Sequence, residues 1–130
     1  MASESLTQQQ TRNLMHELGG QCWRNNSGAY QDERGNFIRY GLCNDSKQLN
    51  DRIKSSDLIG ITPTLITQEM VGYYLGVFTA LEIKHPGWTL RPSDKRGHAQ
   101  AEFHRLVKEA CGFAGFVTDP QDALRIIRRV

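Results

Sequence analysis

The order of helical and extended patterns along the chain predicts an α/β protein, in which a mixed central sheet is flanked by helices. A helical pattern opens the chain, short apolar runs follow as strand candidates, and two further helical patterns enclose a last strand candidate. The 130 residues suffice for one well-packed core but not for two. We therefore expect a single domain covering residues 1–130.

The first element is an amphipathic helix expected over residues 6–18. Its apolar side chains lie on an otherwise polar segment, and the pair Gly19-Gly20 provides a helix stop. Residues 21–24 are expected to form a short strand. Residues 25–28 are turn formers that tolerate positive φ, so the chain is expected to turn there.

The middle of the chain contains the strand candidates. Residues 37–42 alternate enough for a strand, and the polar residues 44–55 are interpreted as an exposed loop or short helix that could approach a substrate. The apolar runs at residues 58–61 and 77–83 suit central, buried strands, and residues 65–70 between them could also form β structure.

The C-terminal part is expected to place two helices around one strand. After a loop over residues 86–97, apolar side chains recur at helical spacing, at Phe103, Leu106, Val107 and Ala110. A strand is expected at residues 113–117. Residues 119–122 then cap a last helix, whose inward side chains would be Ala123, Leu124, Ile126 and Ile127.

Composition favours an ordinary globular protein. Sixteen Lys and Arg side chains nearly balance fourteen Asp and Glu, and the net charge is +2. No apolar run is long enough for a membrane span and the N-terminus lacks the pattern of a signal peptide, so a cytoplasmic protein without a membrane partner is expected. The three cysteines are widely spaced, which argues against a disulfide framework or a zinc site.

The basic residues are unevenly distributed. Many lie in one part of the C-terminal half, at Lys84, Arg91, Lys95, Arg96, His98, His104, Arg105 and Lys108, and three more at Arg125, Arg128 and Arg129. A basic surface of this kind suits a polyanion. The alternative is that these side chains are the solvated faces of two amphipathic helices.

Two carboxylates and one ammonium are expected at strand ends. Glu82 and Lys84 share one face of their strand, since side chains alternate, and Asp57 precedes the neighbouring strand. Oxygen ligands of this kind suit Mg²⁺, and Lys84 could orient or deprotonate the attacking water. The alternative is an exposed strand that alternates charged and apolar residues by chance.

Four ordered elements resemble the PD-(D/E)xK nuclease superfamily, and within it the VRR-NUC family. They are residues 23–28, the segment 56–60 that carries Asp57, the triplet Glu82-Ile83-Lys84, and Gln100 at the start of the following helix. The resemblance covers nearly the whole chain. Ser56 stands where the family usually has proline before the aspartate. The resemblance implies a restriction-endonuclease-like core.

The resemblance also implies roles for the site residues. Asp57 and Glu82 would bind Mg²⁺ or Mn²⁺ together with the backbone carbonyl of Ile83, Lys84 would position the attacking water, and Gln100 would line the site. A solvent-exposed amide is the alternative for Gln100. Glu4 is the only nearby candidate for a further glutamate expected on the first helix, and it is not assigned to the site.

The function expected from this resemblance is a metal-dependent, structure-specific DNA endonuclease, phage or prophage encoded, which cuts branched DNA such as four-way junctions as a homodimer. Candidate DNA-binding residues are Arg24, Asn25, Ser27, His85, Lys95, Arg96 and His104. His85 could equally be a polar strand-end residue, and Trp88, Tyr73 and Tyr74 could be dimer contacts or core. The alternatives are a general or restriction-like duplex nuclease and a catalytically decayed DNA-binding module.

Overall fold

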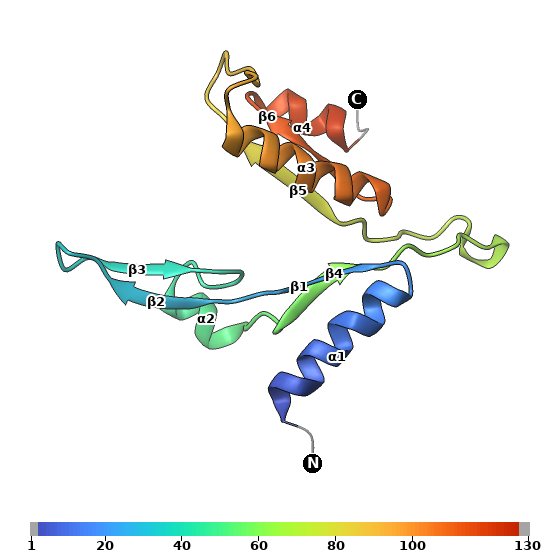
Figure 1. The fold of residues 1–130 in the computed structure, drawn as a ribbon, viewed down its shortest axis with the longest axis horizontal. Coiled ribbons are helices and arrows are strands. Elements are labelled where there is room, and N and C mark those ends of the chain that lie inside the picture. Colours follow the sequence, from blue (N-terminus) through green and yellow to red (C-terminus); the bar gives the residue numbers. More distant parts are fainter. Residues whose placement is uncertain (1–2, 128–130) are drawn as a thin grey trace. The chain divides into compact units, whose positions relative to one another are not determined.

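The computed structural model describes residues 3–127 of a small mixed α/β protein with short sheets and helices (Figure 1). The chain forms two compact units, residues 1–60 and residues 61–130, and each is described by itself. The expected single domain stays a prediction. Arg128 and Arg129 of the basic C-terminal trio lie outside the described residues.

The first unit contains two helices and two small sheets. Its elements are α1 (Glu4–Glu17), β1 (Gln21–Arg24), β2 (Gly28–Gln31), β3 (Phe37–Tyr40), α2 (Lys47–Arg52) and β4 (Leu58–Ile61), whose last residue begins the second unit. Strand β1 pairs with β4, and β2 pairs with β3 in an antiparallel hairpin. For residues 44–55 we expected an exposed loop or a short helix, and the structure forms the short helix α2 there.

Helix α1 forms where the sequence predicts it. The Ser3 hydroxyl caps it by accepting a hydrogen bond from the Leu6 amide at 3.1 Å, and Gly19 ends it with φ +87°. Most of its apolar side chains remain exposed, including Leu6 at 44% and Leu14 at 53%. Little of the helix is therefore held by buried apolar contacts.

Close backbone contact holds β4 against β1. The Asn25 amide donates to the Asp57 carbonyl at 2.8 Å, and Gly60 lies against the backbone of Gln21 and Cys22. Because Asn25 meets Asp57 and Gln21 meets Gly60, β1 and β4 run antiparallel. A side chain at position 60 would collide with the Gln21 carbonyl, so glycine is required for this approach.

Strand β2 was not predicted. Residues 25–28 have the composition of a turn, and only a short segment with one aromatic side chain, Tyr30, follows them. The hairpin nonetheless places Gly28 opposite Tyr40 and Tyr30 opposite Ile38. Pairing with β3 supplies the backbone hydrogen bonds that local composition does not indicate.

The second unit is a parallel strand pair between two helices. Its elements are η1 (Gln68–Met70), β5 (Thr79–Ile83), α3 (Lys95–Glu109), β6 (Phe113–Val117) and α4 (Pro120–Ile126). Strands β5 and β6 lie side by side (Figure 1). In their parallel register Glu82 stands opposite Phe116. The β structure considered for residues 65–70 is wrong, because they form loop and a short 3₁₀ helix.

Helices α3 and α4 cover opposite faces of β6. His104 of α3 contacts the Phe116 ring, whereas Ile126 of α4 lies against Gly115, and neighbouring strand residues face opposite sides. Phe103, Leu106, Val107 and Ala110 of the predicted stripe are buried or half-buried, and Val107 is 0% exposed. On α4, Leu124 is 37% exposed and is not one of the inward side chains.

Strand β5 is covered on one face. Leu81 is 38% exposed and Ile83 is 68% exposed, whereas Ala80 and Glu82 are half-buried. The expectation of a central strand with both faces buried is therefore wrong for β5, since α4 packs over β6 rather than over β5.

The segment between β4 and β5 is open to solvent. Tyr73 is 81% exposed and Tyr74 is 101% exposed, so neither belongs to a core in the described chain. Among residues 3–127, no helix combines the length and apolar character needed to cross a membrane.

Candidate active site

The end of strand β5 presents an acid and a base on one face. Glu82 and Lys84 lie two residues apart, and the Lys84 amide donates to the Val117 carbonyl at 2.8 Å, which extends the pairing with β6 beyond the strand. The Lys84 Nζ lies 4.0 Å from Glu82 Oε1, with the two side chains 16% and 38% exposed. This is a charge contact and not a hydrogen bond.

Gln100, in the second turn of α3, contacts the same carboxylate. Its Nε2 donates to Glu82 Oε1 at 2.7 Å. A carboxylate only accepts hydrogen bonds, so the amide nitrogen must face Glu82 and the amide oxygen must face away. That oxygen is buried and has no hydrogen-bond partner. The structure thus joins Glu82, Lys84 and Gln100, three of the four residues expected to be catalytic.

Two aromatic rings surround the Lys84 ammonium. Its Nζ lies over the Trp88 ring at 5.1 Å from the centroid and over the Phe116 ring at 5.9 Å. The two rings are 4.6 Å apart, and the His104 ring contacts Phe116 edge-on at 4.7 Å. Sequence reasoning did not assign Phe116 to the site. The register of the strands could have found it, because a strand that pairs in parallel with β5 places one residue opposite Glu82, and that residue is Phe116.

His104 is a buried residue of this site. It is 7% exposed, and burial holds the pKa of its imidazole below the usual value, an effect that Lys108 increases and Glu82 opposes. The neutral ring is therefore favoured near neutral pH. A DNA contact by His104 would require this buried side chain to become exposed, because it packs inward against Phe116.

Asp57 lies in the first unit, at the entry to β4. The segment before the strand is tied to β1 by Asn25, whose side-chain amide donates to the Ser56 carbonyl at 2.9 Å. Asn25, expected to contact DNA, thus has a structural role in holding this segment. Asp57 itself is exposed. That Asp57 shares one site with Glu82 and Lys84 stays a prediction.

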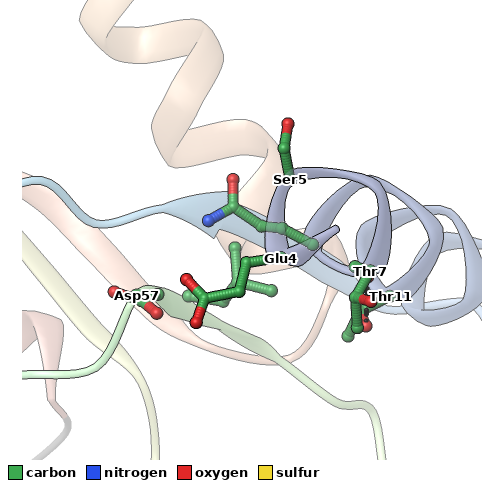
Figure 2. A pocket seen from close by; sticks show the side chains of 7 residues that line it. Glu4, Ser5, Thr7, Thr11 and Asp57 are labelled. Atoms are coloured by element: carbon green, nitrogen blue, oxygen red, sulfur yellow. Dashed lines mark hydrogen bonds between the residues drawn. The ribbon is translucent and has the colours of Figure 1, made fainter. Parts of the chain in front are cut away.

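A pocket of about 620 Å³ opens beside Asp57, between that residue and the first turns of α1. It is lined by Glu4, Ser5, Thr7, Gln8, Thr11, Asp57 and Leu58. Figure 2 shows the Glu4 side chain extending from α1 with its carboxylate toward the side on which Asp57 lies. The sequence left Glu4 unassigned, because alignment of the first helix could not show which of its residues approach Asp57.

The remaining candidate DNA-binding residues are exposed but dispersed. Arg24 and Ser27 lie in the first unit, and Lys95 and Arg96 open α3 in the second. The exposed His85 has its Nδ1 2.9 Å from the Pro86 carbonyl. Their contact with DNA stays a prediction.

Some of the other basic side chains are neutralised within their own helices. Arg105 bonds Glu102 and Glu109 at 2.5 Å each, and Arg125 bonds Asp122. For these residues the alternative of solvated helix faces fits the structure.

Glu82 contributes one carboxylate, an oxygen ligand of the kind that a hard divalent cation binds. The Gln100 amide oxygen is turned away from that carboxylate, because its amide nitrogen makes the contact. Within residues 3–127, no group of three or more His, Cys, Asp or Glu side chains is close enough to hold a metal ion.

Comparison of the chain with protein-family models, curated proteins and solved structures gave no match.

Proposed function

We propose that this protein is a Mg²⁺- or Mn²⁺-dependent DNA endonuclease with a PD-(D/E)xK active site of the VRR-NUC kind on a restriction-endonuclease-like core. The observation that carries the proposal is the cluster of Gln100, Glu82 and Lys84, in which an amide orients a carboxylate beside a half-buried ammonium. A cluster of this type at the end of a strand suits hydrolysis of a phosphodiester.

In this proposal, Glu82 and Asp57 hold the cation together with the Ile83 carbonyl. The bound ion would supply a nucleophile near neutral pH and neutralise charge on the phosphate. Gln100 keeps the Glu82 carboxylate in one orientation through its 2.7 Å hydrogen bond. Lys84 donates to the attacking water or to a phosphate oxygen. Glu4 supplies a further carboxylate beside Asp57.

The proposed substrate is branched DNA, such as a four-way junction, cut by a homodimer in the cytoplasm, or in the host cytoplasm if the protein is phage encoded. A two-fold dimer can present two active sites to a two-fold junction. Lys95 and Arg96 support a polyanionic substrate. Both are exposed in the first turn of α3, and that turn contains no acidic side chain.

The test is incubation of the purified protein with labelled four-way junction, flap and linear duplex DNA, each with Mg²⁺, with Mn²⁺ and with EDTA. Metal-dependent cutting confined to the junction is the expected result. Cutting of every substrate would instead favour a general duplex nuclease. Binding without cutting would favour a decayed DNA-binding module.

Variants of two proposed site residues make the same experiment specific to the mechanism. Lys84→Ala and Asp57→Ala should abolish cleavage and retain the circular dichroism spectrum of the wild type. The matched control is Lys47→Ala, an exposed lysine paired with Asp51 inside α2. A folded Lys84→Ala protein with undiminished cleavage would contradict the mechanism.

A further inference from the structure

Two aromatic rings and one carboxylate lie around the Lys84 ammonium. Its Nζ lies within about 6 Å of two ring centroids, at 5.1 Å for Trp88 and 5.9 Å for Phe116, the range in which a ring face attracts a cation. Its acidic neighbour, Glu82 Oε1, is 4.0 Å away, beyond hydrogen-bond distance. Only 16% of the lysine side chain is exposed.

We propose that Trp88 and Phe116 are positioning residues, which fix the Lys84 ammonium beside Glu82 while leaving its N–H donors free for the attacking water or a phosphate oxygen. This inference rests on the proposed nuclease function. A carboxylate in direct contact would occupy one of the three donors along a fixed direction. A ring face attracts the charge without requiring that alignment.

The fold holds both rings in place. Phe116 lies opposite Glu82 in the parallel register of β5 and β6, and the edge-on His104 ring packs against it at 4.7 Å. Trp88 sits in a turn in which its amide donates to the His85 carbonyl at 3.1 Å, and Gly87 adopts φ +83°. The two rings stand 4.6 Å apart with 45° between their planes, so they face the ammonium from two directions.

The kinetic test compares Trp88→Leu with Trp88→Phe on the DNA that the wild type cuts, with MgCl₂. Leucine keeps the apolar contact and removes the ring, so kcat should fall about three- to thirtyfold, or ~0.6–2 kcal/mol at about 1.4 kcal/mol per factor of ten. KM should stay within about twofold, because the ring positions Lys84 rather than binding DNA. Phenylalanine should restore most of kcat.

The matched control is Phe37→Leu in strand β3. This variant removes another ring that lies under a cation, Arg39 at 5.1 Å, on an exposed part of the first unit. It should leave kcat unchanged. A Trp88→Leu protein with the kcat of the wild type, or with a change confined to KM, would overturn the inference.

A second measurement does not depend on cleavage. In protein labelled with ¹³C at the lysine ε carbons, the Lys84 ε protons should resonate upfield of those of the other lysines, because they lie over aromatic faces. Lys84→Arg assigns the signal by removing it, and Trp88→Leu should move it downfield. An unshifted Lys84 signal in the wild type would overturn the inference.

The two measurements separate the inference from the function on which it rests. If the wild type cuts no DNA, the proposed nuclease function fails, and the lysine spectrum still shows whether the rings restrain the ammonium. If the wild type cuts DNA but the spectrum shows no ring effect, the nuclease proposal stands and the positioning role is refuted.

Discussion

At the residue scale, the Glu82 carboxylate has neighbours from two different elements. Lys84 follows it on the same chain segment, and Gln100 reaches it from α3. The shared face of Glu82 and Lys84 was predictable from strand alternation alone. The orientation of the Gln100 amide was not, since it depends on where α3 crosses β5. The rings of Trp88 and Phe116 escaped prediction for the same reason.

Removal of the Gln100 amide should weaken catalysis. Gln100→Leu leaves a side chain of similar size but loses a hydrogen bond to a charged group, worth ~1.5–3 kcal/mol. We therefore expect kcat/KM for DNA cleavage to fall about ten- to a hundredfold. The control is Gln121→Leu on the exposed side of α4. Equal cleavage by both variants would show that Gln100 does not hold Glu82 in the reactive orientation.

The Asp122 carboxylate makes the free energy of unfolding depend on pH in the acid range. Hydrogen bonds from the Thr118 amide and hydroxyl, both at 3.0 Å, lower the pKa of its carboxyl to about 2 from an ordinary 3.8. Because the folded-state pKa is depressed, the ionised form stabilises the protein above pH 3.8, and this contribution is lost as the pH falls toward about 2.

Urea unfolding of Asp122→Asn tests this linkage. The variant should have a lower free energy of unfolding than the wild type near neutral pH, and the difference should shrink as the pH falls through the same window. Asp45→Asn, an exposed residue before α2, is the control. A difference that stays constant with pH would contradict the role of the Asp122 charge.

At the element scale, local signals predicted most helices and strands. The C-terminal helix α4 begins at a capping box in which Asp119 accepts from the Gln121 amide at 2.9 Å, as residues 119–122 indicated. The strand at residues 113–117 has the predicted bounds. The prediction missed strand β2, because pairing with β3, and not the composition of β2, determines that strand.

The turn between α3 and β6 requires glycine. A Cβ at Gly112 would lie 2.9 Å from the Phe78 carbonyl oxygen and 2.8 Å from a Val107 methyl, and the backbone atom cannot move without disturbing the start of β5. Gly112→Ala should therefore lower the free energy of unfolding by ~1–3 kcal/mol. Chemical denaturation measures this loss.

Gly76→Ala is the matched control for this glycine. A Cβ there meets nothing within 4 Å, so the stability of this variant should equal or slightly exceed that of the wild type. Equal loss of stability in both variants would show that the close approach at Gly112 is not the cause.

At the scale of the whole molecule, the candidate site residues divide between two units. Asp57 and Glu4 belong to residues 1–60, and Glu82, Lys84 and Gln100 belong to residues 61–130. The proposed nuclease needs carboxylates from both. The proposal therefore predicts that loss of either Asp57 or Glu82 removes cation binding.

Thermal unfolding with and without Mn²⁺ tests whether both Asp57 and Glu82 bind the cation. A cation bound only by the folded state stabilises it by RT ln(1 + [L]/Kd), ~1.4 kcal/mol at roughly ten times Kd, so Tm should rise in the wild type. Asp57→Ala and Glu82→Ala should each remove most of that rise, whereas Asp45→Ala should retain it. Loss in Glu82→Ala alone would indicate a cation held by the second unit only.

The sequence by itself determined the order of most elements, the glycine stop of α1, the cap of α4, and the placement of Glu82 and Lys84 on one face, because these follow from local propensity and the period of the strand. Only the tertiary structure decided the contacts of Gln100 with Glu82, the burial of His104, and the rings around Lys84. These depend on the register of β5 against β6 and on the position of α3 over them, which join residues distant in the chain.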